Sequence, residues 1–191
     1  MRILLSGASG LIGSALETEL QQRDHVCHRL VRRPARDETE HEWAPAQGRL
    51  PAAGLPAVDA AVHLSGYNIA AGRWTRRVKE RIRDSRVQST RLLCETLAGL
   101  AEPPATLVCA SAVGYYGDRG DELLAEDAPP GRDQFLPQVC RAWEAATAPA
   151  AEAGVRVVNA RLGPVLSTAG GMLPKMLRAL KLAPEDEERV A

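Results

Sequence analysis

The amino-acid sequence predicts an α/β protein in which helices cover both faces of a mainly parallel β-sheet. Segments typical of strands alternate along the 191 residues with segments whose apolar side chains recur at the helical period. The first strand is followed by three glycines in the spacing G-x-x-G-x-x-G, and a helical pattern follows the glycines. Because a strand, a glycine turn and a helix open a doubly wound sheet in this order, we predict a Rossmann fold.

The remaining elements are expected in the same alternation. Five strands are predicted, around 3–5, 25–31, 59–64, 106–112 and 155–162. Helices are predicted after the glycines and at about 74–100, 135–153 and 172–182. Pro149 should kink or shorten the third of these helices. The polar segment 34–56 is rich in Pro and Gly, and we expect it to be a surface loop.

Composition excludes several classes of protein. The chain is 45% hydrophobic and 25% charged with a formal net charge of +0, which predicts a globular protein without a general attraction to nucleic acid or to a membrane. Basic residues crowd the segment 73–91, but acidic residues are interleaved with them, which favours a solvated helix face over a nucleic-acid patch. The four cysteines have neither metal-like nor redox-like spacing, so we expect buried free thiols, no metal and a cytoplasmic location.

The glycine turn predicts a dinucleotide site. Gly7, Gly10 and Gly13 allow a sharp turn and a close approach of the backbone to a pyrophosphate, and the following helix offers free N–H groups to it. A tight turn without a ligand is the alternative, and the strand–helix–strand context argues against it.

The end of the second strand predicts which dinucleotide binds. NAD-binding units carry a carboxylate there for the ribose hydroxyls, whereas this chain has Arg32 and Arg33. A guanidinium can bind a 2′-phosphate with two parallel hydrogen bonds, so we predict NADP, with Arg32 the stronger candidate and Arg33 the second. In the alternative interpretation, two exposed arginines simply end the strand.

Ligands of a doubly wound sheet bind beyond the carboxyl ends of its strands. Three segments are therefore expected to form the site: 7–13, 64–66 and 111–117. The predicted cofactor-binding residues in the first two are Gly7, Ser9, Gly10, Leu11, Ile12 and Gly13, with Leu64, Ser65 and Gly66.

Short motifs along nearly the whole chain resemble one family. They include S-G-A-S-G-L-I-G at 6–13, H-L-S-G-Y-N-I at 63–69, S-A-V-G-Y-Y-G at 111–117 and R-L-G-P-V-L at 161–166. With them the chain resembles an extended or atypical short-chain dehydrogenase/reductase of the NAD-dependent epimerase/dehydratase superfamily, in its sugar-nucleotide epimerase-like branch. The resemblance implies that Ser111 hydrogen-bonds a substrate oxygen. It also implies a Tyr-x-x-x-Lys pair on the next helix, in which tyrosine is the general acid/base.

This chain departs from that pattern, because no Tyr-x-x-x-Lys occurs in it. The two positions hold Val139 and Trp143, which can neither transfer a proton nor carry a positive charge. Tyr115, Tyr116 and Glu144 are the alternative acid/base candidates, and we assign catalysis to Ser111 and Tyr115. In the alternative interpretation, Tyr115 and Tyr116 only pack around the cofactor site. Glu144 would then be a surface carboxylate.

The predicted organisation is an NADP-binding Rossmann domain at 1–166, followed at 167–191 by the start of a substrate lobe or a C-terminal tail, which is expected to be truncated. The predicted function is that of an NADP-dependent oxidoreductase or epimerase acting on a carbonyl or sugar-nucleotide-like small molecule. The alternative is a non-catalytic NADP(H)-binding sensor or scaffold. A homodimer is a further expectation.

Overall fold

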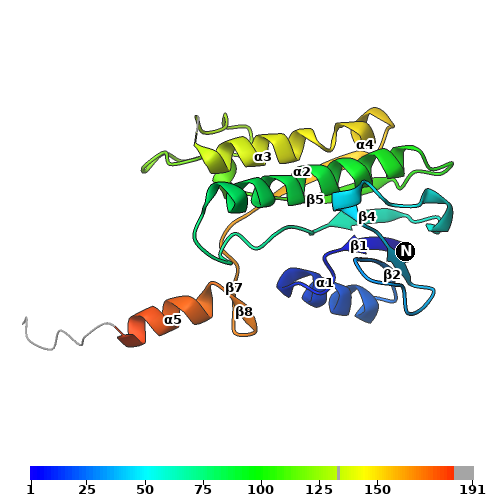
Figure 1. Ribbon diagram of the computed structural model, residues 1–191, viewed down its shortest axis with the longest axis horizontal. Coiled ribbons are helices and arrows are strands. Elements are labelled where there is room, and N and C mark those ends of the chain that lie inside the picture. The colour runs from blue at the N-terminus through cyan, green and yellow to red at the C-terminus, as the bar shows by residue number, and fades with distance from the viewer. Residues whose placement is uncertain (133, 183–191) are drawn as a thin grey trace, which may run out of the picture.

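The structure is a computed structural model that describes residues 1–132 and 134–182. Its centre is a six-stranded sheet in the order β3-β2-β1-β4-β5-β6, in which all neighbouring strands are parallel (Figure 1). The strands are β1 (Arg2–Ser6), β2 (Val26–Val31), β3 (Glu40–Glu42), β4 (Ala60–His63), β5 (Thr106–Ala112) and β6 (Arg156–Leu162). This order is that of a doubly wound Rossmann fold, which confirms the predicted fold class.

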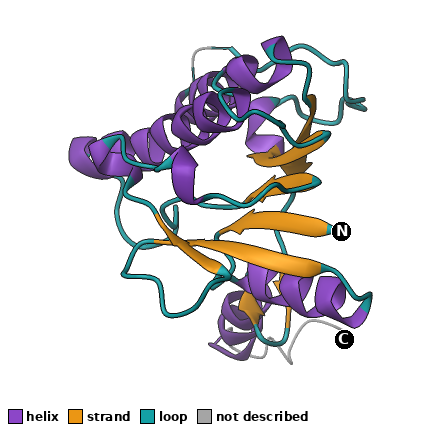
Figure 2. Ribbon diagram, turned by 90° about the vertical axis from the view of Figure 1, so that its right-hand side faces the viewer, coloured by secondary structure: helices purple, strands orange, loops and turns teal. Residues whose placement is uncertain are grey.

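Helices cover both faces of the sheet (Figure 2). The helices are α1 (Leu11–Gln22), α2 (Arg76–Ala98), α3 (Phe135–Ala145), α4 (Ala148–Glu152) and α5 (Leu173–Leu182). Helix α1 packs on one face, and α2, α3 and α4 form the layer on the other (Figure 1). Because all six strands are parallel, their carboxyl ends meet at one edge of the sheet, where a ligand can bind.

The predicted helix at 135–153 is divided in two. Helix α3 ends at Ala145, and α4 begins at Ala148 with Pro149 in its first turn. Proline has no N–H to donate and is tolerated only where a helix begins, so the break follows from its position.

The expectation of a surface loop at 34–56 was wrong in part. This segment adds the short strand β3, which pairs with β2 at the sheet edge, and the 3-10 turns Pro45–Gln47 and Ala52–Gly54. Glu40 and Trp43, which are only 6% and 2% exposed, are the physical reason. The indole joins the hydrophobic core and the carboxylate binds arginine, so a polar sequence is held against the sheet.

The core lies between the sheet and α2. Leu4 and Leu107 of the strands meet Leu93 and Leu97 of the helix, and each of the four is at most 1% exposed. All four cysteines are buried free thiols, as predicted. Burial raises the pKa of the Cys94 thiol to about 12, so it stays protonated.

The segment after β6 forms a small hairpin, β7 (Leu166–Ser167) and β8 (Gly170–Gly171), followed by α5. The hairpin contacts the start of α1, since a methyl group on Gly171 would lie 3.1 Å from a methyl carbon of Leu11. Helix α5 stands apart from the two helical layers (Figure 1). Its position is compatible with the predicted boundary at 166, which stays a prediction, and residues 183–191 of the predicted lobe or tail lie outside the described residues.

Within the described ranges, none of the helices has both the length and the apolar character that crossing a membrane requires.

Candidate functional site

The glycine turn joins β1 to α1 at the carboxyl edge of the sheet. Gly7 has φ +78°, a backbone conformation that disfavours a side chain. A methyl group on Gly13 would lie 2.1 Å from the carbonyl oxygen of Gly7, a distance that no carbon atom tolerates. Gly10 closes the turn, with its N–H donating to the Gly7 carbonyl at 3.0 Å. The strand and the helix therefore approach as closely as a dinucleotide fold requires.

The N-terminus of α1 is open to an anion. Helix α1 begins at Leu11, and no described side chain caps it or places a carboxylate in its first turn. The first N–H groups of a helix have no intrahelical partner and carry a partial positive charge. The turn therefore fits a pyrophosphate, because it provides unpaired donors and a cradle that a Cβ atom would fill.

The segment 64–66 lies beside this turn, as predicted. A methyl group on Gly7 would lie 2.9 Å from the carbonyl carbon of Leu64 and 3.1 Å from the amide nitrogen of Ser65. The loops after β1 and β4 therefore form one continuous surface. The roles of Leu64, Ser65 and Gly66 toward a cofactor stay predictions.

A buried histidine holds the ends of β1 and β4 together below the turn. The His63 ring has no solvent exposure and lies 2.6 Å from the Ser6 hydroxyl through Nδ1 and 3.2 Å from the Ser89 hydroxyl through Nε2. Burial lowers the pKa of His63 to about 4, so the imidazole is neutral at physiological pH. One neutral side chain thus links both strands to α2.

The two arginines after β2 have different surroundings. Arg33 donates two hydrogen bonds of 2.6 Å to the two carboxylate oxygens of Glu40, and these hold the pKa of Glu40 at about 2. The N–H of Arg36 also donates to Glu40, at 3.0 Å. Arg32 is exposed, and its guanidinium makes no ion pair within the described chain. Arg32 is therefore the guanidinium that is free to bind a phosphate, and Arg33 mainly fixes the turn around it.

Ser111 lies at the end of β5 in a polar network. Its hydroxyl donates to Glu144 Oε1 at 2.6 Å, and Arg161 binds both carboxylate oxygens of Glu144 at 2.9 Å. Ser111 is 2% exposed, and Arg161 faces it from the register-matched position of β6. The hydroxyl is thus committed to Glu144 in this arrangement, and its predicted contact with a substrate oxygen stays untested.

The same arginine organises both tyrosines of the 111–117 segment. The Tyr115 ring lies under the Arg161 guanidinium, 3.5 Å from its central carbon, and the Tyr116 hydroxyl accepts a 2.9 Å hydrogen bond from it. Hydrogen bonds to Glu144 are the main cause that raises the pKa of Arg161, so this cation is permanent. Sequence reasoning did not single out Arg161, although R-L-G-P-V-L at 161–166 was among the motifs noted.

The positions that were expected to hold tyrosine and lysine carry packing side chains. Val139 and Trp143 are 3% and 6% exposed on α3. The indole N–H of Trp143 donates to the Thr90 hydroxyl on α2 at 2.9 Å. These residues attach α3 to α2 and offer no group for proton transfer.

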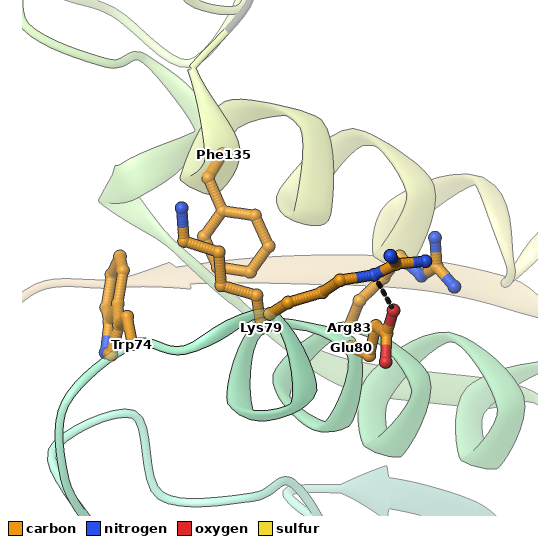
Figure 3. A pocket seen from close by; sticks show the side chains of 6 residues that line it. Trp74, Lys79, Glu80, Arg83 and Phe135 are labelled. Carbon is orange, nitrogen blue, oxygen red and sulfur yellow. Dashed lines mark hydrogen bonds and ion pairs between the residues drawn. The ribbon is translucent and has the colours of Figure 1, made fainter.

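A basic hollow of about 390 Å³ lies outside this site, between the start of α2 and the start of α3 (Figure 3). Lys79 stands over the Phe135 ring at 5.3 Å, and the ring of Trp74 meets Phe135 edge-on. The arginines of α2 are partly paired with acidic neighbours, including Arg76 with Glu80 at 3.0 Å. This pairing agrees with a solvated helix face, the interpretation favoured from the sequence.

Fold and site together define a dinucleotide-binding α/β domain. The family model for the NAD dependent epimerase/dehydratase family matches residues 3–189, and the chain belongs to this family. This finding confirms the resemblance at the level of the family.

Several known proteins are similar to this chain. An epimerase family protein of Mycobacterium bovis, Mb2239, is 46% identical over 174 residues, which cover 91% of this chain and 57% of the relative. The human epimerase family protein SDR39U1 is 33% identical over 184 residues, 95% of this chain and 60% of the relative. The chain therefore spans less than two thirds of the length of these curated relatives.

Two solved structures extend the comparison. The nucleoside-diphosphate sugar epimerase from Corynebacterium glutamicum matches with a TM-score of 0.81 and 42% identity, over 95% of this chain and 37% of that one. Human SDR39U1 isoform 2, solved with NADPH, matches with a TM-score of 0.83 and 32% identity, over 95% of this chain and 60% of that one.

Proposed function

We propose that this chain is the NADP-binding domain of an oxidoreductase or epimerase of the extended short-chain dehydrogenase class, acting on a carbonyl or sugar-nucleotide-like substrate. A bound nicotinamide would supply the hydride chemistry at a carbon that bears an oxygen. One observation carries the proposal. At the carboxyl edge of the sheet, no side chain caps the N-terminus of α1, and the guanidinium of Arg32 makes no ion pair among the described residues. The NADPH bound to the human relative supports the same cofactor choice.

The preference for NADP over NAD follows from the charges after β2. Glu40, which faces this turn from β3, is neutralised by Arg33 and is almost fully enclosed. A carboxylate free to bind ribose hydroxyls would repel a 2′-phosphate, whereas Arg32 attracts one. The local charge balance therefore favours the phosphorylated cofactor.

The acid/base role in this proposal belongs to Tyr115. Its ring lies under the Arg161 guanidinium, 3.5 Å from the central carbon, and this cation–π contact fixes the position of the phenol. The Ser111 hydroxyl donates its proton to Glu144, so it would have to give up that bond to donate to a substrate carbonyl, whereas it could still accept from a substrate hydroxyl. For a carbonyl substrate, the contribution of Ser111 is thus smaller than the resemblance alone implies.

A non-catalytic NADP(H)-binding protein is the second candidate function. The buried side chains of Val139 and Trp143, at the positions where proton transfer was expected, favour it. Both candidate functions require the cofactor site. They differ only in whether the bound cofactor reacts with a substrate.

Calorimetric titration with NADPH and, separately, NADH tests the cofactor proposal. We expect NADPH to bind more tightly, and R32A to weaken NADPH by about tenfold or more with little effect on NADH, because hydrogen bonds between charged groups are strong. R23A is the matched control, since Arg23 is an exposed arginine that follows the far end of α1 and pairs with Glu19. Equal affinities for the two cofactors, or an equal loss on both in R32A, would refute the phosphate-binding role.

The two candidate functions are separated by the absorbance of reduced nicotinamide in the presence of a panel of carbonyl compounds and sugar nucleotides. Steady oxidation of NADPH, or epimerisation of a sugar nucleotide, favours the enzyme. Tight NADPH binding without either reaction favours the sensor or scaffold.

A further inference from the structure

Arg86 is a half-buried cation on α2 that has no acidic partner in the described part of the chain. Its Nη1 donates to the backbone carbonyl oxygens of Tyr67 at 3.1 Å and Ile82 at 2.9 Å, and these are the hydrogen bonds found for its guanidinium in the described structure. No ion pair among the described residues includes it. Desolvation accordingly lowers the pKa of Arg86. Enclosing a cation without a counter-charge is costly, and the cost is offset when a ligand supplies acceptors.

The guanidinium lies between the loop that follows β4 and helix α3. A methyl group on Gly66 would lie 3.3 Å from its central carbon, Cζ. On the other side, Cζ lies 5.0 Å from the centroid of the Trp143 ring. Nε and Nη2 of Arg86 therefore remain available as hydrogen-bond donors at this junction between the loop and α3.

The strand order places this junction at a particular end of the cofactor site. Arg32 follows β2, the glycine turn follows β1, and Gly66 follows β4, on the opposite side of β1 from β2. A dinucleotide that lies across the strand ends has its 2′-phosphate at β2 and its pyrophosphate at the glycine turn. Its nicotinamide half then extends toward β4 and β5, where Arg86 lies.

Arg161, which faces Ser111 from β6, cannot take the same role. Glu144 occupies its Nε and Nη2, and Tyr116 together with the Glu126 carbonyl occupies Nη1. Trp143 carries no charge. Arg86 is thus the cation of this junction whose donors are not already committed.

We propose that Arg86 binds the nicotinamide-ribose half of the dinucleotide, donating from Nε and Nη2 to its hydroxyl or carboxamide oxygens. This inference rests on the proposed cofactor site and adds a residue to it. The stacked indole and the two backbone carbonyls hold the guanidinium in place before the ligand arrives, so little side-chain freedom is lost on binding.

The test compares two ligands on the 191-residue chain: NADPH, and adenosine 2′,5′-bisphosphate, which lacks the nicotinamide half. R86M should weaken NADPH by about tenfold and leave the affinity for the bisphosphate within about twofold. R86K, which keeps the charge, should recover part of the NADPH affinity, and the emission of bound NADPH should shift in R86M. R91M is the matched control, because Arg91 is an exposed arginine on α2 that pairs with Glu95.

Thermal unfolding of each variant separates loss of binding from loss of the fold. If R86M does not fold, R86Q takes its place, since its amide removes the charge and keeps a hydrogen-bond donor. Unchanged NADPH affinity in R86M, or an equal loss on both ligands, overturns the proposal for Arg86 alone. Failure of the wild-type chain to bind either ligand overturns the cofactor site and this proposal together.

Discussion

Replacement of Gly13 by alanine tests the closest contact of the candidate site. The added methyl group would lie 2.1 Å from the Gly7 carbonyl oxygen, 2.8 Å from its carbonyl carbon and 2.9 Å from the Ala8 Cα. All three atoms belong to the backbone, so no side chain can rotate away. Either α1 or the glycine turn must move by about 1 Å to restore ordinary van der Waals contact.

The expected free-energy change is the difference of two effects. Overpacking typically costs about 1–3 kcal/mol, and a contact this short against backbone belongs at the upper end. Alanine regains about 1 kcal/mol of helix propensity relative to glycine. The net destabilisation is therefore about 2 kcal/mol, which corresponds to a decrease of roughly 4–8 °C in the melting temperature of a chain of this size.

Thermal unfolding followed by circular dichroism measures this decrease, and calorimetry measures the accompanying loss of NADPH affinity. G54A is the control, because Gly54 is exposed and a methyl group there would meet nothing within 4 Å. G13A with the melting temperature and NADPH affinity of the wild type would refute the argument that close helix–strand contact shapes the site.

Two further predictions concern the buried networks. The pKa of His63, near 4 in the folded protein, lies below its ordinary value of 6.5, so the unfolded chain takes up a proton first and stability falls as the pH falls from 6.5 toward 4. The loss from this group is about 3 kcal/mol, and an NMR titration that shows an imidazolium at pH 6 would contradict it. E144A leaves the Arg161 guanidinium and the Ser111 hydroxyl without their acceptor, and we expect a loss of about 3 kcal/mol in chemical denaturation. E144Q, which keeps one acceptor, should lose less, and equal stability of E144A and wild type would show that the network is not structural.

The alternation of apolar segments predicted the order of the main strands and helices because it reflects burial on one or both faces of each element. The edge strand β3 did not show in the sequence, since Glu40 is buried through a contact with Arg33, and a buried ion pair leaves no apolar pattern. Trp43 was likewise missed, because a single indole within a polar segment has no periodicity.

The candidate site was predictable only in part. The glycine turn and the missing carboxylate after β2 are local features, and local sequence determines them. The sequence ranked Arg32 above Arg33 only by position, and the physical difference between them comes from Glu40 on another strand.

The sequence by itself determined the alternating α/β fold, the glycine turn and the cationic end of β2, because each depends on residues adjacent in the chain. Only the tertiary structure decided which polar groups are free. It committed Ser111 and Arg161 to Glu144, and it left Arg86 of α2, beside the loop that follows β4, without an acidic partner among the described residues. The physical reason is that hydrogen bonds and ion pairs depend on distances between residues far apart in sequence, and folding alone sets these distances.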